Sequence, residues 1–253
     1  MAPWGKSMKY MGSKSRIAKH IVPIIQQYID DNSPSWYIEP FCGGCNVIDK
    51  IKYERKIASD KQYYLIEFLK NLDKLSQLPK DFVTREHYSD VRNAYHKRKD
   101  HKEFEDWYIG AIGFLASYNG RFFDGGYAGT SEEKGRVRNY YDECKRNIEE
   151  QAPLLKDIIF HCHEYYAWSP VKQAVIYCDP PYKGTKQFSV SKGFDHDEFW
   201  QWCRDMSKEN IVLISEEQAP EDFEIIWSAP VKRTIKTDNK VSKIEKLYKY
   251  KGE

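Results

Sequence analysis

The sequence has no long apolar run and few cysteines, and both absences narrow the class of protein. A membrane-spanning helix needs about 20 consecutive apolar residues, and no apolar run in these 253 residues approaches that length. The first twenty residues also lack the apolar centre of a secretory signal. Six cysteines are too few for a disulfide framework in a chain of this length. We therefore expect a cytoplasmic protein with reduced cysteines and no membrane partner.

The cysteines also form no recognisable metal site. Cys42 and Cys45 make a Cys-x-x-Cys pair, and His161, Cys162 and His163 lie far downstream. This spacing fits no zinc finger, ribbon or knuckle. The pair also encloses two glycines in a predicted turn between a strand and a helix. A zinc or thiol-redox module is therefore the weaker alternative, and we predict no structural metal.

Net charge is almost absent, which leaves the kind of partner open. Forty Lys and Arg residues stand against 38 Asp and Glu residues, a net charge of +2. The basic residues nevertheless gather at both ends: residues 1–20 hold five with no acid, and residues 232–251 hold eight with two acids. Charge runs most often mark solvated faces, but a basic surface also suits a polyanion.

The apolar pattern predicts strands that alternate with helices. Ser13 is the expected cap of the first helix. The predicted strands cover residues 36–40, 56–60, 157–162, 174–179, 210–215 and 223–227, and the predicted helices cover 14–29, 47–53, 65–72 and 196–208. This alternation favours an α/β fold with a mainly parallel sheet covered on both faces.

Residues 79–150 break this rhythm. They are rich in charged and aromatic residues and show no strand–helix repeat. No Gly/Ser-rich linker, internal repeat or low-complexity tract indicates independent domains. We therefore predict one α/β domain built from residues 1–78 and 151–253, with residues 79–150 as an inserted module.

The first chemical signal is the sequence IEPFCGGC at residues 38–45. A strand that ends in glycines and leads into a helix lets the backbone approach a ligand at the carboxyl edge of the sheet. Asp60 ends the next predicted strand, 17 residues after Gly43, where an acid can bind the two ribose hydroxyls of an adenosine-containing cofactor. A structural turn and a surface aspartate are the alternative.

The stronger signal is DPPY at residues 179–182, directly after an apolar strand. The amino group of a planar aromatic amine becomes nucleophilic when acceptors hold its two N–H groups. Asp179 and the carbonyl of Pro180 are suited to be those acceptors, and Tyr182 is suited to stack on the base. The ring of Tyr182, rather than its hydroxyl, is expected to matter. A plain turn is the alternative.

Four segments occur in an order that resembles the Dam-like family of DNA adenine-N6 methyltransferases. They are KYMGSK at residues 9–14, EPFCGG at 39–44, Asp60 and DPPY at 179–182. SYNG at 117–120, FHC at 160–162, VLIS at 212–215 and KLY at 246–248 extend the resemblance over most of the chain. It implies a Rossmann-like S-adenosylmethionine-dependent methyltransferase sheet, with the inserted, mostly helical module reading double-stranded DNA.

The resemblance also implies roles for single residues. Catalysis would rest on Asp179, Pro180 and Tyr182, and DNA contacts on Tyr118, Asn119 and Arg121. S-adenosylmethionine would be surrounded by Tyr10, Gly12, Lys14, Glu39, Phe41, Gly43, Asp60, Cys162, His163 and Asp179. The sequence departs from the family twice, since the family usually has Trp where Tyr10 stands and Gly where Cys45 stands. The implied reaction is direct in-line methyl transfer to a flipped adenine by a monomeric enzyme.

Other interpretations stay open at this point. A cytosine-N4 methyltransferase uses a similar turn but commonly has Ser where Asp179 stands. An RNA or protein amine methyltransferase and a non-catalytic nucleic-acid-binding relic are further alternatives. Residues 118–120 also suit a simple turn, Arg121 an ordinary surface charge, and residues 162–163 the core.

Overall fold

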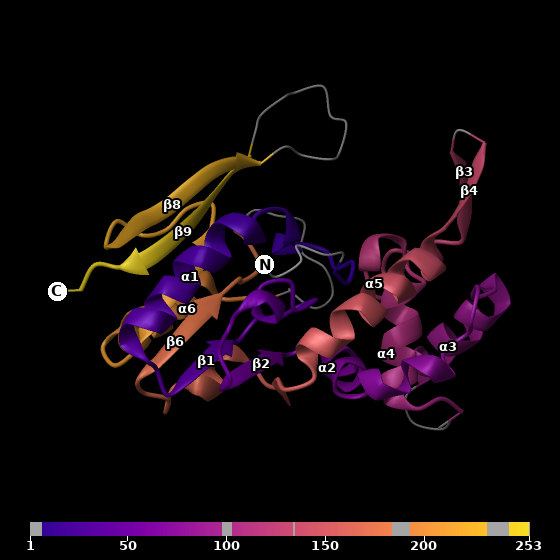
Figure 1. The fold of residues 1–253 in the computed structure, drawn as a ribbon, viewed down its shortest axis with the longest axis horizontal. Coiled ribbons are helices and arrows are strands. Elements are labelled where there is room, and N and C mark those ends of the chain that lie inside the picture. The colour runs from indigo at the N-terminus through magenta and orange to yellow at the C-terminus, as the bar shows by residue number, and fades with distance from the viewer. Residues whose placement is uncertain (1–6, 98–102, 134, 184–192, 232–242, 253) are drawn as a thin grey trace.

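The computed structural model describes residues 7–97, 103–133, 135–183, 193–231 and 243–252. Its centre is a seven-stranded sheet in the order β5-β2-β1-β6-β7-β9-β8 (Figure 1). The strands are β1 (Trp36–Glu39), β2 (Lys56–Asp60), β5 (Ile159–Cys162), β6 (Ala174–Cys178), β7 (Ile211–Glu216), β8 (Phe223–Val231) and β9 (Lys243–Tyr250). The pairs among β5, β2, β1, β6 and β7 are parallel, whereas β9 lies antiparallel between β7 and β8. The predicted α/β fold with a mainly parallel sheet is confirmed.

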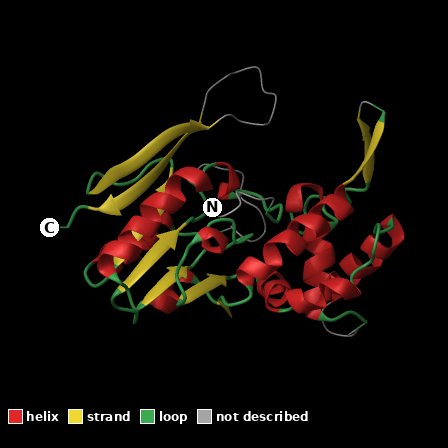
Figure 2. Ribbon diagram, in the orientation of Figure 1, coloured by secondary structure: helices red, strands yellow, loops and turns green. Residues whose placement is uncertain are grey.

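Helices cover both faces of this sheet (Figure 2). Successive residues of a strand point to opposite faces. Tyr37 of β1 packs in the buried cluster that contains α1 (Ala18–Asn32), whereas its neighbour Ile38 packs in the cluster that contains α6 (His196–Ser207). The nearly unbroken apolar runs of the central strands follow from this double coverage.

Three elements of the structure differ from the sequence predictions. Ser13 caps a helical turn as expected, because its Oγ accepts a hydrogen bond from the amide of Ser15 at 3.1 Å, but this turn is a separate 3₁₀ turn ahead of α1. The predicted helix over 47–53 is wrong, since only one 3₁₀ turn forms (Ile48–Lys50). Strand β9 was not predicted, because its sequence KIEKLYKY mixes charged and apolar residues without strict alternation and resembles a solvated basic terminus.

Residues 79–150 fold as helices and one hairpin beside the sheet (Figure 1). The elements are α3 (Arg85–Lys97), α4 (Asp106–Leu115), the hairpin of β3 (Thr130–Glu133) and β4 (Arg136–Asn139), and α5 (Tyr140–Leu155), which continues beyond residue 150. Helix α2 (Tyr63–Lys70) packs against α4, and the hairpin projects away from the helices. The hairpin was missed because its strands are short and charged.

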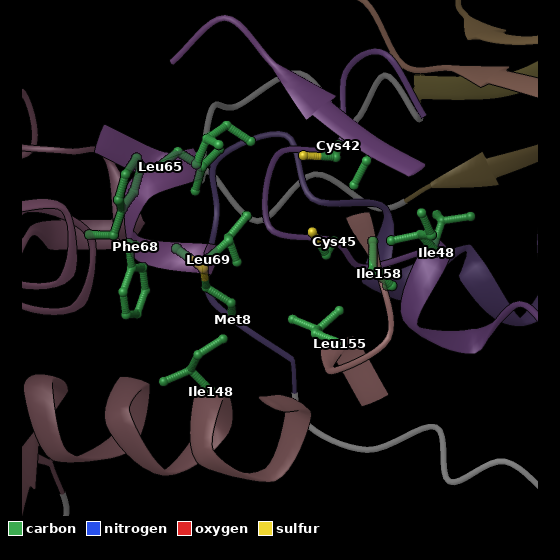
Figure 3. Packing of buried hydrophobic residues seen from close by; sticks show 14 of the residues in the cluster. Met8, Cys42, Cys45, Ile48, Leu65, Phe68, Leu69, Ile148, Leu155 and Ile158 are labelled. Atoms are coloured by element: carbon green, nitrogen blue, oxygen red, sulfur yellow. The ribbon is translucent and has the colours of Figure 1, made fainter. Parts of the chain in front are cut away.

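One buried cluster connects the helices to the turn that follows β1. In Figure 3 the side chains of Cys42 and Cys45 lie on one side of Met8. Those of Ile148 and Leu155, which belong to α5, lie on the side facing that helix. All five side chains are buried. The helical region therefore shares a core with the sheet at the level of the predicted functional turns.

Candidate active site

The turns after β1 and β6 lie side by side at the carboxyl edge of the sheet. These strands pair in parallel, with Ile38 opposite Ile176. The strand order reverses between them, because β2 lies on the far side of β1 and β7 on the far side of β6. Open α/β sheets bind ligands at such a reversal. Residues 40–45 and 179–182, predicted separately from the sequence, therefore meet at one place.

Asp179 contacts a lysine from the N-terminal segment. Lys14 Nζ lies 2.7 Å from Asp179 Oδ1 and 4.5 Å from the centre of the Tyr182 ring. The Lys14 side chain is 9% exposed and that of Asp179 is 20% exposed, so the ion pair is largely shielded from water. The structure thus brings three predicted site residues together and orients one carboxylate oxygen with a fixed positive charge.

Tyr182 is fixed at its outer end by a residue that the sequence did not indicate. Its hydroxyl donates a hydrogen bond to Glu245 Oε2 at 2.7 Å, and both residues are 8% exposed. Burial raises the pKa of the Tyr182 hydroxyl well above its ordinary value, and Asp179 adds to this effect. Glu245 lies on β9, the strand that was not predicted, and its position among basic residues concealed it.

Asp60 ends β2 directly beside the glycine turn. It accepts backbone hydrogen bonds from Gly43 at 3.1 Å and from Gln62 at 3.0 Å. Burial raises the pKa of Asp60. Gly43 has a φ of +46°, and a Cβ there would lie 2.8 Å from the Tyr10 ring. Only glycine therefore lets Tyr10 lie against this turn.

The last position of the turn is strained. Cys45 adopts a φ of +56°, a left-handed conformation that costs a non-glycine residue about 1–2 kcal/mol. This explains why glycine is the usual residue at this position in the family that the sequence resembles. Glu39, just before the turn, is 2% exposed and accepts a hydrogen bond from the Tyr37 hydroxyl at 2.6 Å. Burial raises the pKa of Glu39 to about 8.

The remaining predicted cofactor residues surround the same edge. Phe41 stacks on Tyr165 with ring centres 5.6 Å apart. Gly12 has a φ of +81° in the loop between Tyr10 and Lys14. Cys162 pairs with Asp60 in the parallel register of β5 and β2.

His163 follows Cys162 at the end of β5. It is exposed and stacks on His161, with ring centres 5.4 Å apart. The Trp168 ring lies close to both histidines and donates a hydrogen bond from Nε1 to Ser59 Oγ at 2.8 Å. These residues add an aromatic wall near Asp60 that the sequence only partly indicated.

The turn at residues 118–121 lies against the N-terminal segment. Tyr118 is 47% exposed, and Asn119 has the left-handed φ of +56° that favours Asn in turns. A Cβ on Gly120 would lie 2.0 Å from the carbonyl oxygen of Lys9, so this glycine allows close backbone contact. Arg121 is half-buried. Residues 118–121 therefore form a turn, and the exposure of Tyr118 is compatible with the predicted DNA contact.

Gln151 of α5 is a connecting residue that the sequence gave no reason to single out. It is 1% exposed, and its Oε1 accepts the amide of Met8 at 2.9 Å. Its Nε2 lies 3.1 Å from the carbonyl oxygen of Gly44, 3.2 Å from that of Cys45 and 2.9 Å from Asp49 Oδ2. One buried amide thus ties α5 to the N-terminal segment and to the turn after β1.

A second connection lies at the other end of α5. Glu143 accepts from Arg138 of the hairpin at 2.8 Å and from Lys9 at 2.9 Å. The hydrogen bond with Arg138 contributes most to lowering the pKa of Glu143, which is about 2. This carboxylate is therefore ionised at neutral pH and joins the hairpin to the segment that carries Tyr10.

The cysteines and the helices add three plain findings. All six cysteines are free thiols, and burial raises the pKa of Cys42. No cluster of three or more potential metal ligands occurs among the residues that the structure describes. Within the same residues, no helix combines the length and apolarity needed to cross a bilayer.

The strand order and the acidic turn at its switch point define a Rossmann-like α/β protein with a candidate ligand site at the carboxyl edge of its sheet. The model of the D12 class N6 adenine-specific DNA methyltransferase family matches residues 10–202, and the chain belongs to this family. The protein is thus an adenine-specific DNA methyltransferase, and the resemblance drawn from the sequence is confirmed.

The chain is also similar to individual methyltransferases of known sequence or structure. The type II methyltransferase M.MjaIII of Methanocaldococcus jannaschii is 26% identical over 214 residues, which cover 76% of this chain and 74% of that protein. The type II methyltransferase M.FokI of Planomicrobium okeanokoites is 24% identical over 194 residues, which cover 69% of this chain but 28% of that protein. Among solved structures, the rRNA methyltransferase aviRa of Streptomyces viridochromogenes aligns with a TM-score of 0.44 and 10% identity, over 99% of this chain and 88% of that one.

Proposed function

We propose that the enzyme transfers a methyl group from S-adenosylmethionine to the N6 amino group of one adenine, flipped out of a specific duplex DNA sequence. The observation that carries this proposal is the cluster of Asp179, Lys14 and Tyr182 at the point where the strand order reverses. It combines a carboxylate for an amino group with an aromatic ring for a base.

The edge of the sheet beside this cluster fits the proposed cofactor. Asp60 is a buried acid at the end of β2, the position from which an acid binds ribose hydroxyls. Gly43 and the Tyr10 ring are suited to line the path towards Asp179. Gly12, Lys14, Glu39, Phe41, Cys162, His163 and Asp179 complete the proposed surroundings. When bound, S-adenosylmethionine supplies an electrophilic methyl group on a positively charged sulfur.

The residues of the chain position the amine rather than deprotonate it. Asp179 and the Pro180 carbonyl accept the two N–H groups, which favours a tetrahedral nitrogen with its lone pair free for attack. A carboxylate with an ordinary pKa of about 3.9 is too weak a base for a neutral aryl amine. As the N–C bond forms, the bond between the methyl group and sulfur would break and leave S-adenosylhomocysteine. Asp179 stabilises the nitrogen once it is cationic and accepts its surplus proton, which then passes to solvent. Tyr182 holds the base by stacking.

Residues 79–150 are the proposed target-recognition module. Flipping an adenine costs a few kcal/mol, which protein contacts must offset. The exposed ring of Tyr118 lies next to the N-terminal segment and is suited to fill the vacated space. Asn119, Arg121 and the projecting hairpin of β3 and β4 provide polar and basic contacts to the duplex. We propose that the enzyme acts as a cytoplasmic monomer.

Labelled S-adenosylmethionine and mixed-sequence duplex DNA test the proposed function directly. Nucleoside analysis is expected to find N6-methyladenine, and sequencing is expected to place it at one recurring site. A methylated cytosine as the product would instead support the cytosine-N4 alternative. Labelling of RNA but not of DNA would contradict the proposal.

Removing the acid at the end of β2 is expected to weaken cofactor binding. Asp60→Ala loses charge-assisted hydrogen bonds to the ribose, so affinity for S-adenosylmethionine should fall by about 1–3 kcal/mol. Calorimetry measures this change. Asp60 also holds the amide of Gly43, so Asp60→Asn is the matched variant, because its amide oxygen can keep that contact. Unchanged affinity in a folded Asp60→Ala protein would refute the assignment.

The turn at residues 118–121 is expected to affect DNA recognition. Tyr118→Ala should slow methylation by about 5–150-fold, because a ring that stacks on bases in the vacated space contributes about 1–3 kcal/mol. Arg121→Ala should reduce the salt dependence of DNA binding if Arg121 contacts phosphate. Single-turnover rates and titrations at several salt concentrations measure these effects. If both variants keep target preference and rate, the recognition surface lies elsewhere in residues 79–150.

A further inference from the structure

A second buried carboxylate lies beside the catalytic turn. Glu216 is the last residue of β7 and is 3% exposed. Its Oε1 accepts the amide of Lys183 at 3.3 Å, whereas its Oε2 is fully buried and has no hydrogen-bond partner in the described part of the chain. Buried polar atoms in proteins are nearly always hydrogen-bonded, so an exception next to a reactive turn points to a missing ligand.

The sheet register places Glu216 against both ends of this turn. Strand β7 pairs in parallel with β6, with Ile214 opposite Cys178, so the residues that follow each strand are neighbours. Lys183, whose amide Glu216 holds, comes directly after Tyr182. Asp179, at the start of the turn, is near enough to influence the ionisation of Glu216. Glu216 therefore lies between the proposed amine acceptor and the end of the stacking residue.

The surroundings of Glu216 favour its neutral form. Burial raises its pKa to about 8, and the negative charges of Glu217 and Asp179 act in the same direction. Backbone hydrogen bonds from Lys183 and Glu217 oppose this shift only in part. Lys246 lies opposite Glu216 in the antiparallel register of β9. With a pKa of about 8, the Glu216 carboxyl is mostly protonated at neutral pH and offers an O–H donor beside the acceptors of the turn.

Adenine presents a matching edge. Its amino group donates two N–H bonds, and the ring nitrogen next to it, N1, accepts one. Asp179 and the Pro180 carbonyl supply acceptors for the amino group, but neither supplies a donor for the ring nitrogen. We propose that protonated Glu216 donates a hydrogen bond to N1 of the flipped adenine and thereby helps to select this base. Guanine would be disfavoured, because it carries an N–H at the same position.

This inference rests on the proposed function, and a base analogue tests it separately. In 1-deazaadenine a C–H group replaces N1. We expect E216L to slow single-turnover methylation of the adenine duplex by about 10–100-fold, the effect of one lost hydrogen bond in a site built for it. Wild type and E216L should methylate the 1-deazaadenine duplex at equal rates. E216Q should recover much of the loss, because an amide can both accept from Lys183 and donate.

The pH profile gives an independent readout that a purely structural role would not produce. The wild-type rate should fall as pH rises through about 8, because Glu216 then loses its proton and places a second charge beside Asp179. E216Q should not show this decline. Glu224→Gln, an exposed change on β8, is the matched control and should keep the wild-type profile.

Two results would overturn the proposed role of Glu216 without contradicting the proposed methyl transfer. One is that E216L loses the same factor on the adenine and 1-deazaadenine duplexes. The other is that the rate of E216Q still falls as pH rises through about 8. This second result is sufficient even if E216L does not fold. In all these reactions nucleoside analysis of the wild-type product checks the proposed function separately. If wild type forms no N6-methyladenine, the proposed function is wrong. If it forms N6-methyladenine but the effect of E216L does not depend on N1, only the proposed role of Glu216 is wrong.

Discussion

Replacing Asp179 by alanine is expected to slow methyl transfer by ~100-fold or more. In the proposed mechanism the carboxylate accepts from the amino group and interacts most strongly when that nitrogen becomes cationic, so its contribution belongs mainly to the transition state. Loss of such an acceptor costs about 3–4 kcal/mol of barrier. Single-turnover kinetics on a duplex that contains the target adenine measure this loss. A near-normal rate in the folded Asp179→Ala protein would contradict the catalytic role.

The ion pair with Lys14 requires a control, because the substitution also leaves a largely buried ammonium group without Asp179. Asp179→Ala alone should therefore lower the free energy of unfolding, and thermal melting would show it. Adding Lys14→Met to Asp179→Ala should recover stability, since both charges are then absent. The rate should stay low in this double variant. If recovered stability also restored the rate, Asp179 would act through the fold rather than on the amine.

The sheet was predictable because its strands are buried on both faces. Residues 36–38 and 174–178 are short, continuous apolar runs, and such runs are typical of central parallel strands. Strand β9 lies between β7 and β8 in the antiparallel part of the sheet, and its sequence KIEKLYKY mixes charged and apolar residues. Nothing in that local pattern distinguishes an antiparallel strand from a solvated basic terminus. The error over 47–53 has a similar origin, because four apolar residues fit both one helical turn and a full helix.

The site was predictable where a backbone motif carries the chemistry. Asp60 ends one buried strand and Asp179 follows another, so the sheet brings them to one edge without further information. Glu216, Glu245 and Gln151 act through contacts between elements distant in sequence. Each of these is a single polar residue in an ordinary strand or helix, and only tertiary packing shows that its partners are Lys183, Tyr182 and Gly44. Such residues have no local signature.

Tyr182 is expected to be the second most sensitive position, and the structure changes what its variants should show. Tyr182→Ala removes the ring that we propose stacks on the flipped base. Such stacking contributes about 1–3 kcal/mol, so the rate should fall by about 5–150-fold. The centre of the ring also lies 4.5 Å from Lys14 Nζ, so Tyr182→Ala also removes a ring that packs against the ion pair between Lys14 and Asp179. Single-turnover rates and binding to a duplex with the target base removed separate stacking from general DNA affinity.

Tyr182→Phe discriminates between the ring and its hydroxyl. From the sequence alone this variant should be almost silent, since phenylalanine stacks equally well. The structure shows the hydroxyl bound to the buried carboxylate of Glu245 at 2.7 Å. Losing a hydrogen bond to a charged group costs about 1.5–3 kcal/mol, so we expect Tyr182→Phe to be less stable and a few-fold slower. Glu245→Gln should reproduce this smaller effect, because its amide oxygen still accepts but carries no charge.

If Tyr182→Phe matched wild type in both melting and rate, the hydroxyl would have no part in positioning the ring. If it were as slow as Tyr182→Ala, position rather than stacking would be the main contribution of this residue.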